Sequence, residues 1–512
     1  MFYKSLMPSK KIKFEKFECQ PCKDGWKFES GKQKLPFGSC VCMYNFDCST
    51  GVLRDNVGVD HLKIVYWENT GRNYSYKIVP PEKNEIYYDV YLYYDWWAYD
   101  NTSSAKPMLF FQCRNGSFKS LYMMNGTVEC NAIDGLPTDN NTLRFNKSIA
   151  MENGQDFIIL SRQNETYKYT CRTNNAVKIS NLEILSVCYY DKRNFAICTQ
   201  HAQTIMYGEQ LNPFNFEVSD DSSGSITFSD DLGPCQKLVV FKDKLYCFRT
   251  YGIVKIVRGK DKKSFDMEKI GMGNNLIYRS TIEICDDKIV FMTTQGLCEF
   301  DGNKVKEIPL PFKKILNQSS QVKAVGKYCK GKYYLSCILD FGDGQKVMSE
   351  NNTGGTQYNN AIIALDCSDY SFDISRGISV SALERIHDKM GDMLVIIYEN
   401  NQIQSSYGML TNSGKFFGSN TIKKGWVSST SDFGYPDKIK FIKEMTLYTK
   451  QNITINLKLD GKVKTISVTG KSGEQTIAIN KKAKLFSFEI IAMEGDNEIS
   501  LPTFVAGVYE WL

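Results

Sequence analysis

Short runs of β-branched and aromatic residues recur along most of the chain, each bounded by Asn, Asp or Gly. Residues 109–113 read Leu-Phe-Phe-Gln-Cys before Arg-Asn-Gly, and residues 157–160 read Phe-Ile-Ile-Leu shortly before Arg-Gln-Asn. Apolar runs of this length between turn residues predict short strands joined as hairpins. The best helical periodicity is confined to the short stretch 381–387. The pattern therefore predicts a nearly all-β chain.

Part of this pattern repeats with a fixed period. The Asp-Lys pair at 243–244 recurs 44 residues later at 287–288, and the glycine at 252 recurs 44 residues later at 296. A third copy follows after another 44 residues, at 331, and a fourth begins at 391, beyond a Gly/Asn-rich insertion at 341–360. A period of about 40–45 residues is typical of four-stranded propeller blades, which bury their faces against each other. We predict a β-propeller of about seven blades, with six to eight compatible; a large β-sandwich is the alternative.

The pattern divides the chain into three parts. Residues 1–59 are predicted to form an N-terminal extended arm and first strands, residues 60–430 the β-propeller, and residues 431–512 a small C-terminal β-sandwich. A polar, Ser-rich junction at 428–434 separates the last two parts. Beyond it, Asp460-Gly461 lies between two alternating runs, which is a strong hairpin signal.

Composition narrows the classes of function. The chain has 63 Lys and Arg against 57 Asp and Glu, a net charge of +6, which is too mild for a protein that coats nucleic acid. Only three histidines occur, His61, His201 and His387, and their wide separation argues against a His-dependent triad or a multi-His metal site. No secretory signal is expected at the N-terminus, and no apolar run approaches the ~20 residues of a membrane span.

Seventeen cysteines raise the question of metal binding. Cys19 and Cys22 form one close pair, and Cys40 and Cys42 form another, so these four are the candidate zinc ligands. Cys40 and Cys42, however, lie in an alternating run typical of a strand, and the remaining cysteines lack metal spacing. We therefore expect reduced, mostly buried cysteines in a chain made in a reducing cytoplasm, with no metal and no cofactor. The sequence has no phosphate-binding loop and no dinucleotide fingerprint.

Three other features have both a functional and a structural interpretation. The N-terminal arm is basic with interleaved aromatics, which suits nucleic acid or an acidic partner, although such arms more often pack on a neighbouring subunit. The acidic pairs Asp220-Asp221 and Asp230-Asp231 could mimic a glycosidase dyad, but their Ser/Gly surroundings favour solvated loop tips. The aromatic cluster at 91–99 could stack on sugars, but burial is the commoner role.

Three stretches in chain order carry a family resemblance. The first comprises 35–39 (Leu-Pro-Phe-Gly-Ser), 45–47 (Asn-Phe-Asp) and 51–58, which opens Gly-Val-Leu-Arg and ends in Gly. The second runs from 193–196 (Arg-Asn-Phe-Ala) through Asn-Pro-Phe at 212–214 and Gly-Ser-Ile at 224–226 to 238–248. The third is 428–438, with Asp-Phe-Gly-Tyr-Pro at 432–436. Together they resemble the β-propeller tail proteins of bacteriophages, which include nozzle or hub proteins of short-tailed phages and related virion proteins.

The resemblance implies a structural subunit of the virion tail and not an enzyme. Such a nozzle, hub or adaptor-type protein forms a ring of copies, with six the expected number, through a heterologous interface that closes. The implied partners are copies of itself, other tail or head–tail connector proteins, and double-stranded DNA that passes during genome ejection without sequence-specific contact. The implied location is the virion tail, after synthesis in the host bacterial cytoplasm.

Two other classes of function stay open. One is host-receptor or carbohydrate binding, with the loops at 351–360 and 91–99 on one propeller face. The other is a propeller glycosidase, which would need one of the acidic pairs in a cleft.

Overall fold

The computed structural model describes most of the chain, and the account below concerns those residues. They are 12–19, 37–48, 50–67, 74–82, 85–95, 106–113, 117–124, 127–137, 143–170, 173–209, 216, 223–259, 265–271, 275–310, 313–316, 321–340, 359–388, 391–400, 404–418 and 420–509. Strands dominate these ranges, so the prediction of a nearly all-β chain is confirmed. Within them, no helix has the length and apolar character needed to cross a bilayer, and the short α1 (Lys313–Leu316) is a single turn.

Six four-stranded sheets follow one another along the chain, each an antiparallel meander. Their strands are β8 (Tyr87–Asp95), β9 (Lys106–Cys113), β10 (Phe118–Met124) and β11 (Thr127–Ala132); β12 (Asn146–Glu152), β13 (Gln155–Arg162), β14 (Glu165–Thr170) and β15 (Asn175–Ser180); β16 (Ile184–Tyr190), β17 (Arg193–Cys198), β18 (Thr204–Tyr207) and β19 (Gly224–Thr227); β20 (Cys235–Phe241), β21 (Lys244–Arg249), β22 (Gly252–Arg258) and β23 (Phe265–Ile270); β24 (Glu283–Cys285), β25 (Lys288–Thr293), β26 (Gly296–Phe300) and β27 (Val305–Glu307); and β28 (Val325–Cys329), β29 (Lys332–Cys337), β30 (Ala361–Asp366) and β31 (Phe372–Arg376).

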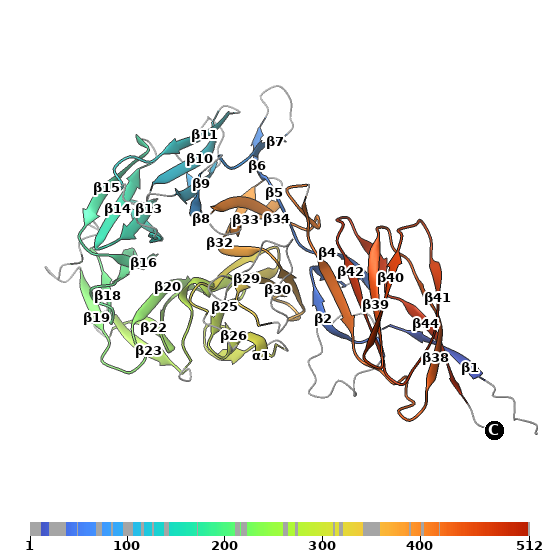
Figure 1. Cartoon of the computed structure of the whole chain (residues 1–512). Helices are drawn as coiled ribbons and strands as arrows, with labels where there is room; N and C mark the ends of the chain where they lie inside the picture. The colour runs from blue at the N-terminus through green and yellow to red at the C-terminus, as the bar shows by residue number, and fades with distance from the viewer. Residues whose placement is uncertain are drawn as a thin grey trace, which may run out of the picture.

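A further sheet combines the two ends of this array. Its order is β32 (Ser379–Asp388), β33 (Gly391–Asn400), β34 (Gln404–Thr411), β5 (Gly58–Asp60), β35 (Lys415–Phe416) and β36 (Asn420–Thr421). The early strand β5 pairs with the late strand β34, Val59 facing Leu410. Beside it lies the hairpin of β6 (Leu62–Trp67) and β7 (Tyr74–Val79). In Figure 1 the sheets stand around one axis, which is the arrangement of a β-propeller.

The period found in the sequence corresponds to the second and third strands of successive sheets. The copies at 243–256 and 287–300 are the hairpins β21–β22 and β25–β26. Asp243 and Asp286 have φ values of 57° and 52°, which suits the tight turns that precede these strands. Each hairpin has both faces buried, because clusters of apolar side chains fill the spaces between neighbouring sheets.

The stretch with the best helical pattern, 381–387, lies in β32 and is a strand. Both of its faces are buried: Ala382 and Ile386 pack toward the sheet that begins at β8, and Val380 and Leu383 pack on the opposite side. A strand covered on both faces loses its two-residue alternation, which explains the misleading pattern.

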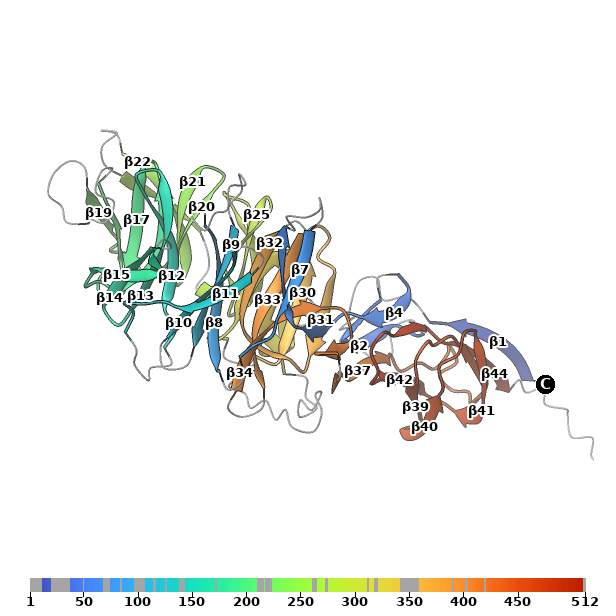
Figure 2. The ribbon, with the colours of Figure 1, turned by 90° about the horizontal axis from the view of Figure 1, so that it is seen from above.

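The strands outside the propeller form what we call the C-terminal unit. One sheet is β1 (Ile12–Glu18), β44 (Thr503–Tyr509), β38 (Lys440–Leu447) and β41 (Gln475–Ala483); another is β2 (Cys40–Tyr44), β37 (Lys424–Ser428), β42 (Phe486–Ala492), β39 (Ile453–Leu459) and β40 (Lys462–Val468); a third is β3 (Phe46–Asp47), β4 (Val52–Asp55) and β43 (Glu498–Ser500). The N-terminal strands therefore pair with C-terminal ones, and Figure 2 shows this unit beside the propeller.

Aromatic side chains join the two larger sheets of the C-terminal unit. Phe504 of β44 lies with its ring centre 4.9 Å from that of Phe486 and 5.0 Å from that of Phe488, both on β42. The same apolar cluster continues through Trp426 and Phe46 into the sheets β24–β27 and β28–β31. The C-terminal unit thus shares one core with its side of the propeller.

Candidate functional site

Charged side chains of the first strands meet near the propeller axis. First strands of neighbouring sheets contact each other, as β12 does with β16 and β32 with β8, and Figure 1 shows β8, β16, β20 and β32 on the inner side of the ring. The Lys327 ammonium on β28 lies 2.7 Å from a carboxylate oxygen of Glu384 on β32 and 3.5 Å from one of Glu283 on β24. Burial opposes the charge of Lys327, but the two carboxylates outweigh it and raise the pKa of the lysine. Lys147 on β12 forms a similar bridge to Asp89 on β8, at 3.2 Å.

Other cations near the propeller axis donate hydrogen bonds to backbone and side-chain oxygen atoms beyond their own sheet. The Lys237 ammonium donates to the carbonyl of Ile282 at 2.5 Å, and burial lowers the lysine pKa to about 8. Arg279, in the 3₁₀ turn Arg279–Thr281, donates to Asn146 at 3.0 Å and to the carbonyl of Leu185. Because Arg279 precedes β24 while its partners belong to the second and third sheets, these bonds reach between sheets that are not neighbours. The axial region is therefore bridged by side chains.

A second polar group is buried where the propeller meets the C-terminal unit. The Lys424 side chain at the start of β37 is fully buried and its ammonium lies 3.5 Å from a carboxylate oxygen of Asp55. It also donates to the carbonyls of Gly414, Ile422 and Glu494, at 3.2, 2.9 and 2.8 Å. Burial lowers the pKa of Lys424, and Asp55 opposes that effect. We call this group the buried junction.

The junction joins three regions of the chain. The backbone N–H and side-chain amide of Asn497, just before β43, donate to the two Asp55 carboxylate oxygens at 3.0 and 2.9 Å. Nearby, the fully buried Asn45 donates to the carbonyls of Arg376 and Lys423 and accepts from the Arg376 N–H at 2.7 Å. Asn45 has φ 62°, a conformation that Asn tolerates better than most residues. The N-terminal segment is thus clamped between propeller and C-terminal unit.

The four candidate zinc ligands are only partly within the described residues. Cys22 lies outside them. Cys40 is buried and Cys42 half-buried on β2, and Cys19 packs against Gly38, whose added Cβ would lie 2.9 Å from the Cys19 sulfur. All three contact the shared apolar core. Within the ranges that the structure describes, no group of three or more His, Cys, Asp or Glu side chains could hold a metal ion.

The residues behind the enzyme and sugar-binding interpretations have structural roles where they are described. Burial would raise the pKa of Asp230, but hydrogen bonds from Lys269 and Arg249 hold it below its ordinary value. Tyr91 and Tyr93 are 5% and 4% exposed, so they offer no face to a sugar. The pair Asp220-Asp221, the residues 96–99 and most of the loop 351–360 lie outside the described residues.

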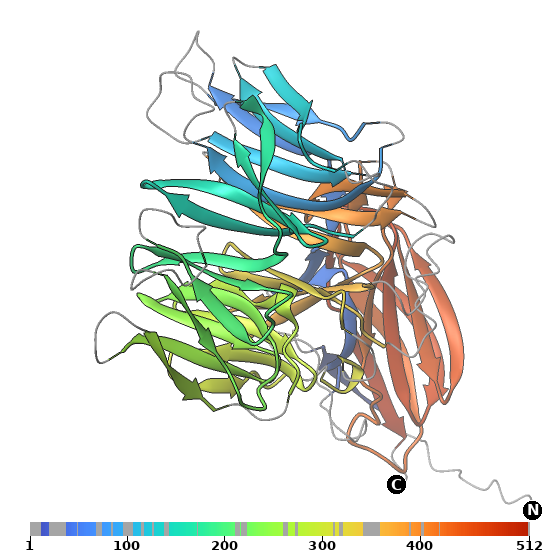
Figure 3. The ribbon, with the colours of Figure 1, turned by 90° about the vertical axis from the view of Figure 1, so that its left-hand side faces the viewer.

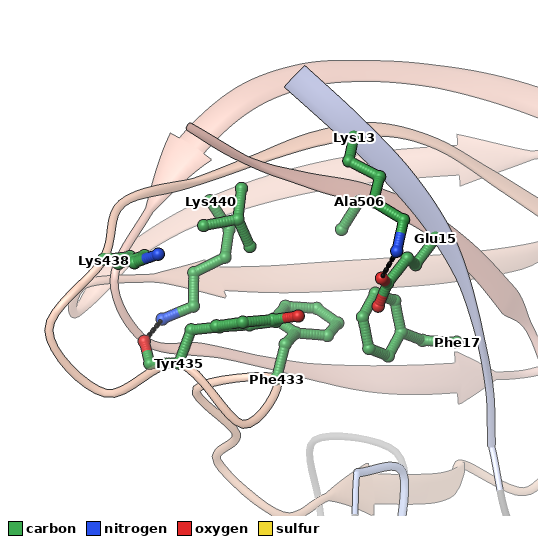
Figure 4. Close-up of a pocket in the computed structure, with 9 residues that line it drawn as sticks. Lys13, Glu15, Phe17, Phe433, Tyr435, Lys438, Lys440 and Ala506 are labelled. Atoms are coloured by element: carbon green, nitrogen blue, oxygen red, sulfur yellow. Dashed lines mark hydrogen bonds and ion pairs between the residues drawn. The ribbon is translucent and has the colours of Figure 1, made fainter. Parts of the chain in front are cut away.

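A small pocket of about 50 Å³, open to solvent, lies between the loop before β38 and the strands β1 and β44 (Figure 4). Its aromatic walls are Phe17, Phe433 and Tyr435, and Lys440 is fixed by a 2.6 Å hydrogen bond to the Tyr435 carbonyl. The lysines Lys13 and Lys438 complete the rim. Of the basic stretch 4–27, only residues 12–19, which contain β1, are described. Lys13 there pairs with Glu15 at 3.2 Å.

The buried junction was missed by the sequence reasoning. Lys424 follows Lys423, and Asp55 follows Arg54, so both look like surface residues in the sequence. Asp55 and Asn497 are separated by 442 positions, and a single sequence carries no signal of such a distant contact.

No protein-family model matches the chain, and no curated protein matches it. Solved structures with a related chain path include the extracellular domain of a putative one-component system from B. thetaiotaomicron, 9% identical with a TM-score of 0.40 over 84% of this chain and 60% of that one. Another is the β-propeller domain of Swd1 from Myceliophteria thermophila, 8% identical with a TM-score of 0.40 over 65% of this chain and 99% of that one. Neither likeness bears on what this chain does.

Proposed function

We propose that the chain is a structural subunit of a phage virion tail, a nozzle, hub or adaptor-type ring protein. In this proposal the six four-stranded sheets and the sheet closed by β5 are seven blades of one toroid. The C-terminal unit is a β-sandwich completed by the N-terminal strands. The proposed partners are copies of itself, expected to number six, and other tail or head–tail connector proteins.

The buried junction is the observation that carries the proposal. A scaffold subunit has to hold its parts in one orientation, and Lys424 binds groups of the N-terminal segment, the propeller and the C-terminal unit at once. The outer two stretches of the family resemblance also meet beside this junction: Cys40 pairs with Ser428, and Ser429 N–H donates to the Ser39 carbonyl at 2.7 Å. Residues far apart in the sequence thus form one element of the scaffold.

Side chains cross the propeller axis, and this determines which channel would carry DNA in the proposal. Because Arg279 and Lys327 span the region between the first strands, the proposed DNA conduit is the axis of the ring of copies. DNA would pass there during genome ejection without sequence-specific contact. Synthesis would take place in the host cytoplasm, and no catalytic role is proposed.

Purified phage particles test the proposal. Mass spectrometry of the particles is expected to detect the chain at a stoichiometry near six, and a reconstruction is expected to show propeller-shaped density around the tail axis. Particles that lack the chain would refute a virion role. Specific hydrolysis or glycan binding by the isolated protein, with no trace of it in particles, would support the alternatives instead.

A further inference from the structure

Three turns, at residues 433–438, 460–461 and 484–485, lie together at the end of the C-terminal unit opposite the buried junction. Lys424 at the junction pairs with Ala492 at one end of β42, whereas these turns adjoin the other end. The Asp460 carboxylate in the β39–β40 turn accepts from the N–H groups of Lys484 and Leu485 at 2.9 and 2.7 Å. The buried Lys440 ammonium donates to the Lys484 carbonyl at 2.7 Å. These bonds fix the turns to one another.

The end formed by these turns is rich in lysine, and we call it the basic end. Its exposed lysines are Lys438, Lys458, Lys462, Lys481, Lys482 and Lys484. Within the described residues, no carboxylate forms an ion pair with Lys458, Lys462 or Lys484, whereas the exposed Lys450 elsewhere in the unit pairs with Asp496 at 2.7 Å. The Asp460 carboxylate is held by backbone N–H groups. Lys458, Lys462 and Lys484 therefore present ammonium groups that pair with no described carboxylate, and the acids close to Lys440 at this end are Asp432, Asp437 and Asp460.

The pocket of Figure 4 adjoins this end through Lys438 and Lys440. Its half-buried Tyr435 ring has the Lys438 ammonium 5.9 Å from the ring centre. Aromatic faces beside lysines are the usual platform for unpaired bases, which stack on the ring while cations hold the phosphates. Lys440 pairs with Val508 near the end of β44, and Figure 3 marks the C-terminus at one end of the C-terminal sheets. In the sequence, Lys10 and Lys11 directly precede β1.

We propose that the basic end binds nucleic acid without sequence preference, with its lysines on backbone phosphates and the Tyr435 face available to an unpaired base. Lysine ammonium groups contact phosphates as point charges and carry no base specificity. The inference rests on the proposed function, because a conduit subunit meets the genome. The inference adds to the proposed function a defined nucleic-acid-binding surface on the C-terminal unit, although the net charge of the whole chain is mild.

A second role competes with this one for Lys462, Lys481 and Lys482, which lie on β40 and β41. β40 and β41 are edge strands, and lysine on an edge strand hinders pairing with another chain. Edge protection would make lysine variants aggregate without changing their affinity for nucleic acid.

Fluorescence anisotropy of the full chain with a labelled duplex of about 20 base pairs, and with one of its strands, tests the proposal. The variant K458Q/K462Q/K484Q removes three charges from the basic end, and K244Q/K304Q/K306Q removes three exposed charges from the propeller as a matched control. Loss of three phosphate contacts should lower the salt slope for duplex by about 2.7, so raising salt from about 50 to 200 mM should weaken the wild type about 40-fold more than the variant. Tyr435→Ala should weaken the single strand selectively.

The outcomes separate the inference from the proposed function. No binding of either probe at low salt, an equal loss in the control variant, or aggregation of the lysine variant with unchanged affinity would each overturn the inference. A chain found in virions but inert toward DNA would leave the proposed function standing. A chain that binds DNA through the basic end but is absent from virions would refute the proposed function alone.

Discussion

Removing the Asp55 carboxylate is the sharpest perturbation of the buried junction. In Asp55→Ala, the Lys424 ammonium would keep three backbone carbonyls within 3.2 Å but would lose the one carboxylate that pairs with it among the described residues. Asn497 would also lose the acceptor for two hydrogen bonds. A buried cation is then left without compensating charge, which is the costly way to break such a pair.

The size of the effect follows from these distances. Two unit charges 3.5 Å apart attract by about 5 kcal/mol at an effective dielectric constant of about 20. The three carbonyls retain part of the stabilisation of Lys424, and broken buried pairs generally cost about 3–5 kcal/mol. We therefore expect Asp55→Ala to lower the free energy of unfolding by about 3–5 kcal/mol. Restoring neutrality in Asp55→Ala/Lys424→Met should recover much of the loss.

Urea unfolding followed by both fluorescence and circular dichroism measures the change. Lys450→Met is the control, because the ion pair of Lys450 with Asp496 is exposed and its loss should change the free energy of unfolding little. The Asp55→Ala loss should shrink as the pH rises above neutrality. Burial lowers the pKa of Lys424 and Asp55 opposes that effect, so without Asp55 the buried ammonium releases its proton at a lower pH than in the wild type. A loss no larger than that of the control would refute the junction as a source of rigidity.

Three further changes probe the propeller by the same unfolding assay. Lys327→Met leaves two axial carboxylates without their cation and should cost about 2–3 kcal/mol, recovered toward acidic pH as the carboxylates protonate; a cost that does not depend on pH would contradict this. Burial raises the pKa of Asp373 from 3.8 to about 6, so the folded protein binds this proton more tightly than the unfolded chain does. The free energy of unfolding should therefore fall by roughly 3 kcal/mol as the pH rises from about 4 to about 6. Asp373→Asn should lose that part of the pH dependence. In Gly326→Ala the new Cβ would lie 2.2 Å from the Tyr333 hydroxyl, so a cost of about 1–3 kcal/mol is expected, whereas Gly473→Ala, with open space around it, should stay within about 0.5 kcal/mol.

The sequence predicted the fold class from local patterns alone. The hairpins at 243–256 and 287–300 are visible because each carries its own turn residues and apolar runs. The all-β prediction therefore needed no long-range information. Where both faces of a strand are buried, as in β32, the local pattern fails and even suggests a helix.

Long-range pairing was beyond the reach of the sequence. The expected N-terminal arm contributes β1, β2, β3 and β4 to sheets whose remaining strands come from the last ninety or so residues. Nothing local to β1 specifies β44 as its partner. The same holds for the buried junction, because its charged residues owe their burial to segments brought together by folding.

The position of the buried junction links closure of the propeller to docking of the C-terminal unit. β5 enters the propeller three residues after Asp55, and β37 leaves it at Lys424. Pairing of β5 with β34 closes the array of sheets, while the bond between Asp55 and Lys424 fixes the C-terminal unit at the same place. Closing a loop of some 350 residues costs conformational entropy, and a single contact does not offset that cost. Many bonds have to form together to do so. Closure of the propeller and docking of the C-terminal unit therefore stabilise each other, as a subunit that holds neighbours at fixed positions requires.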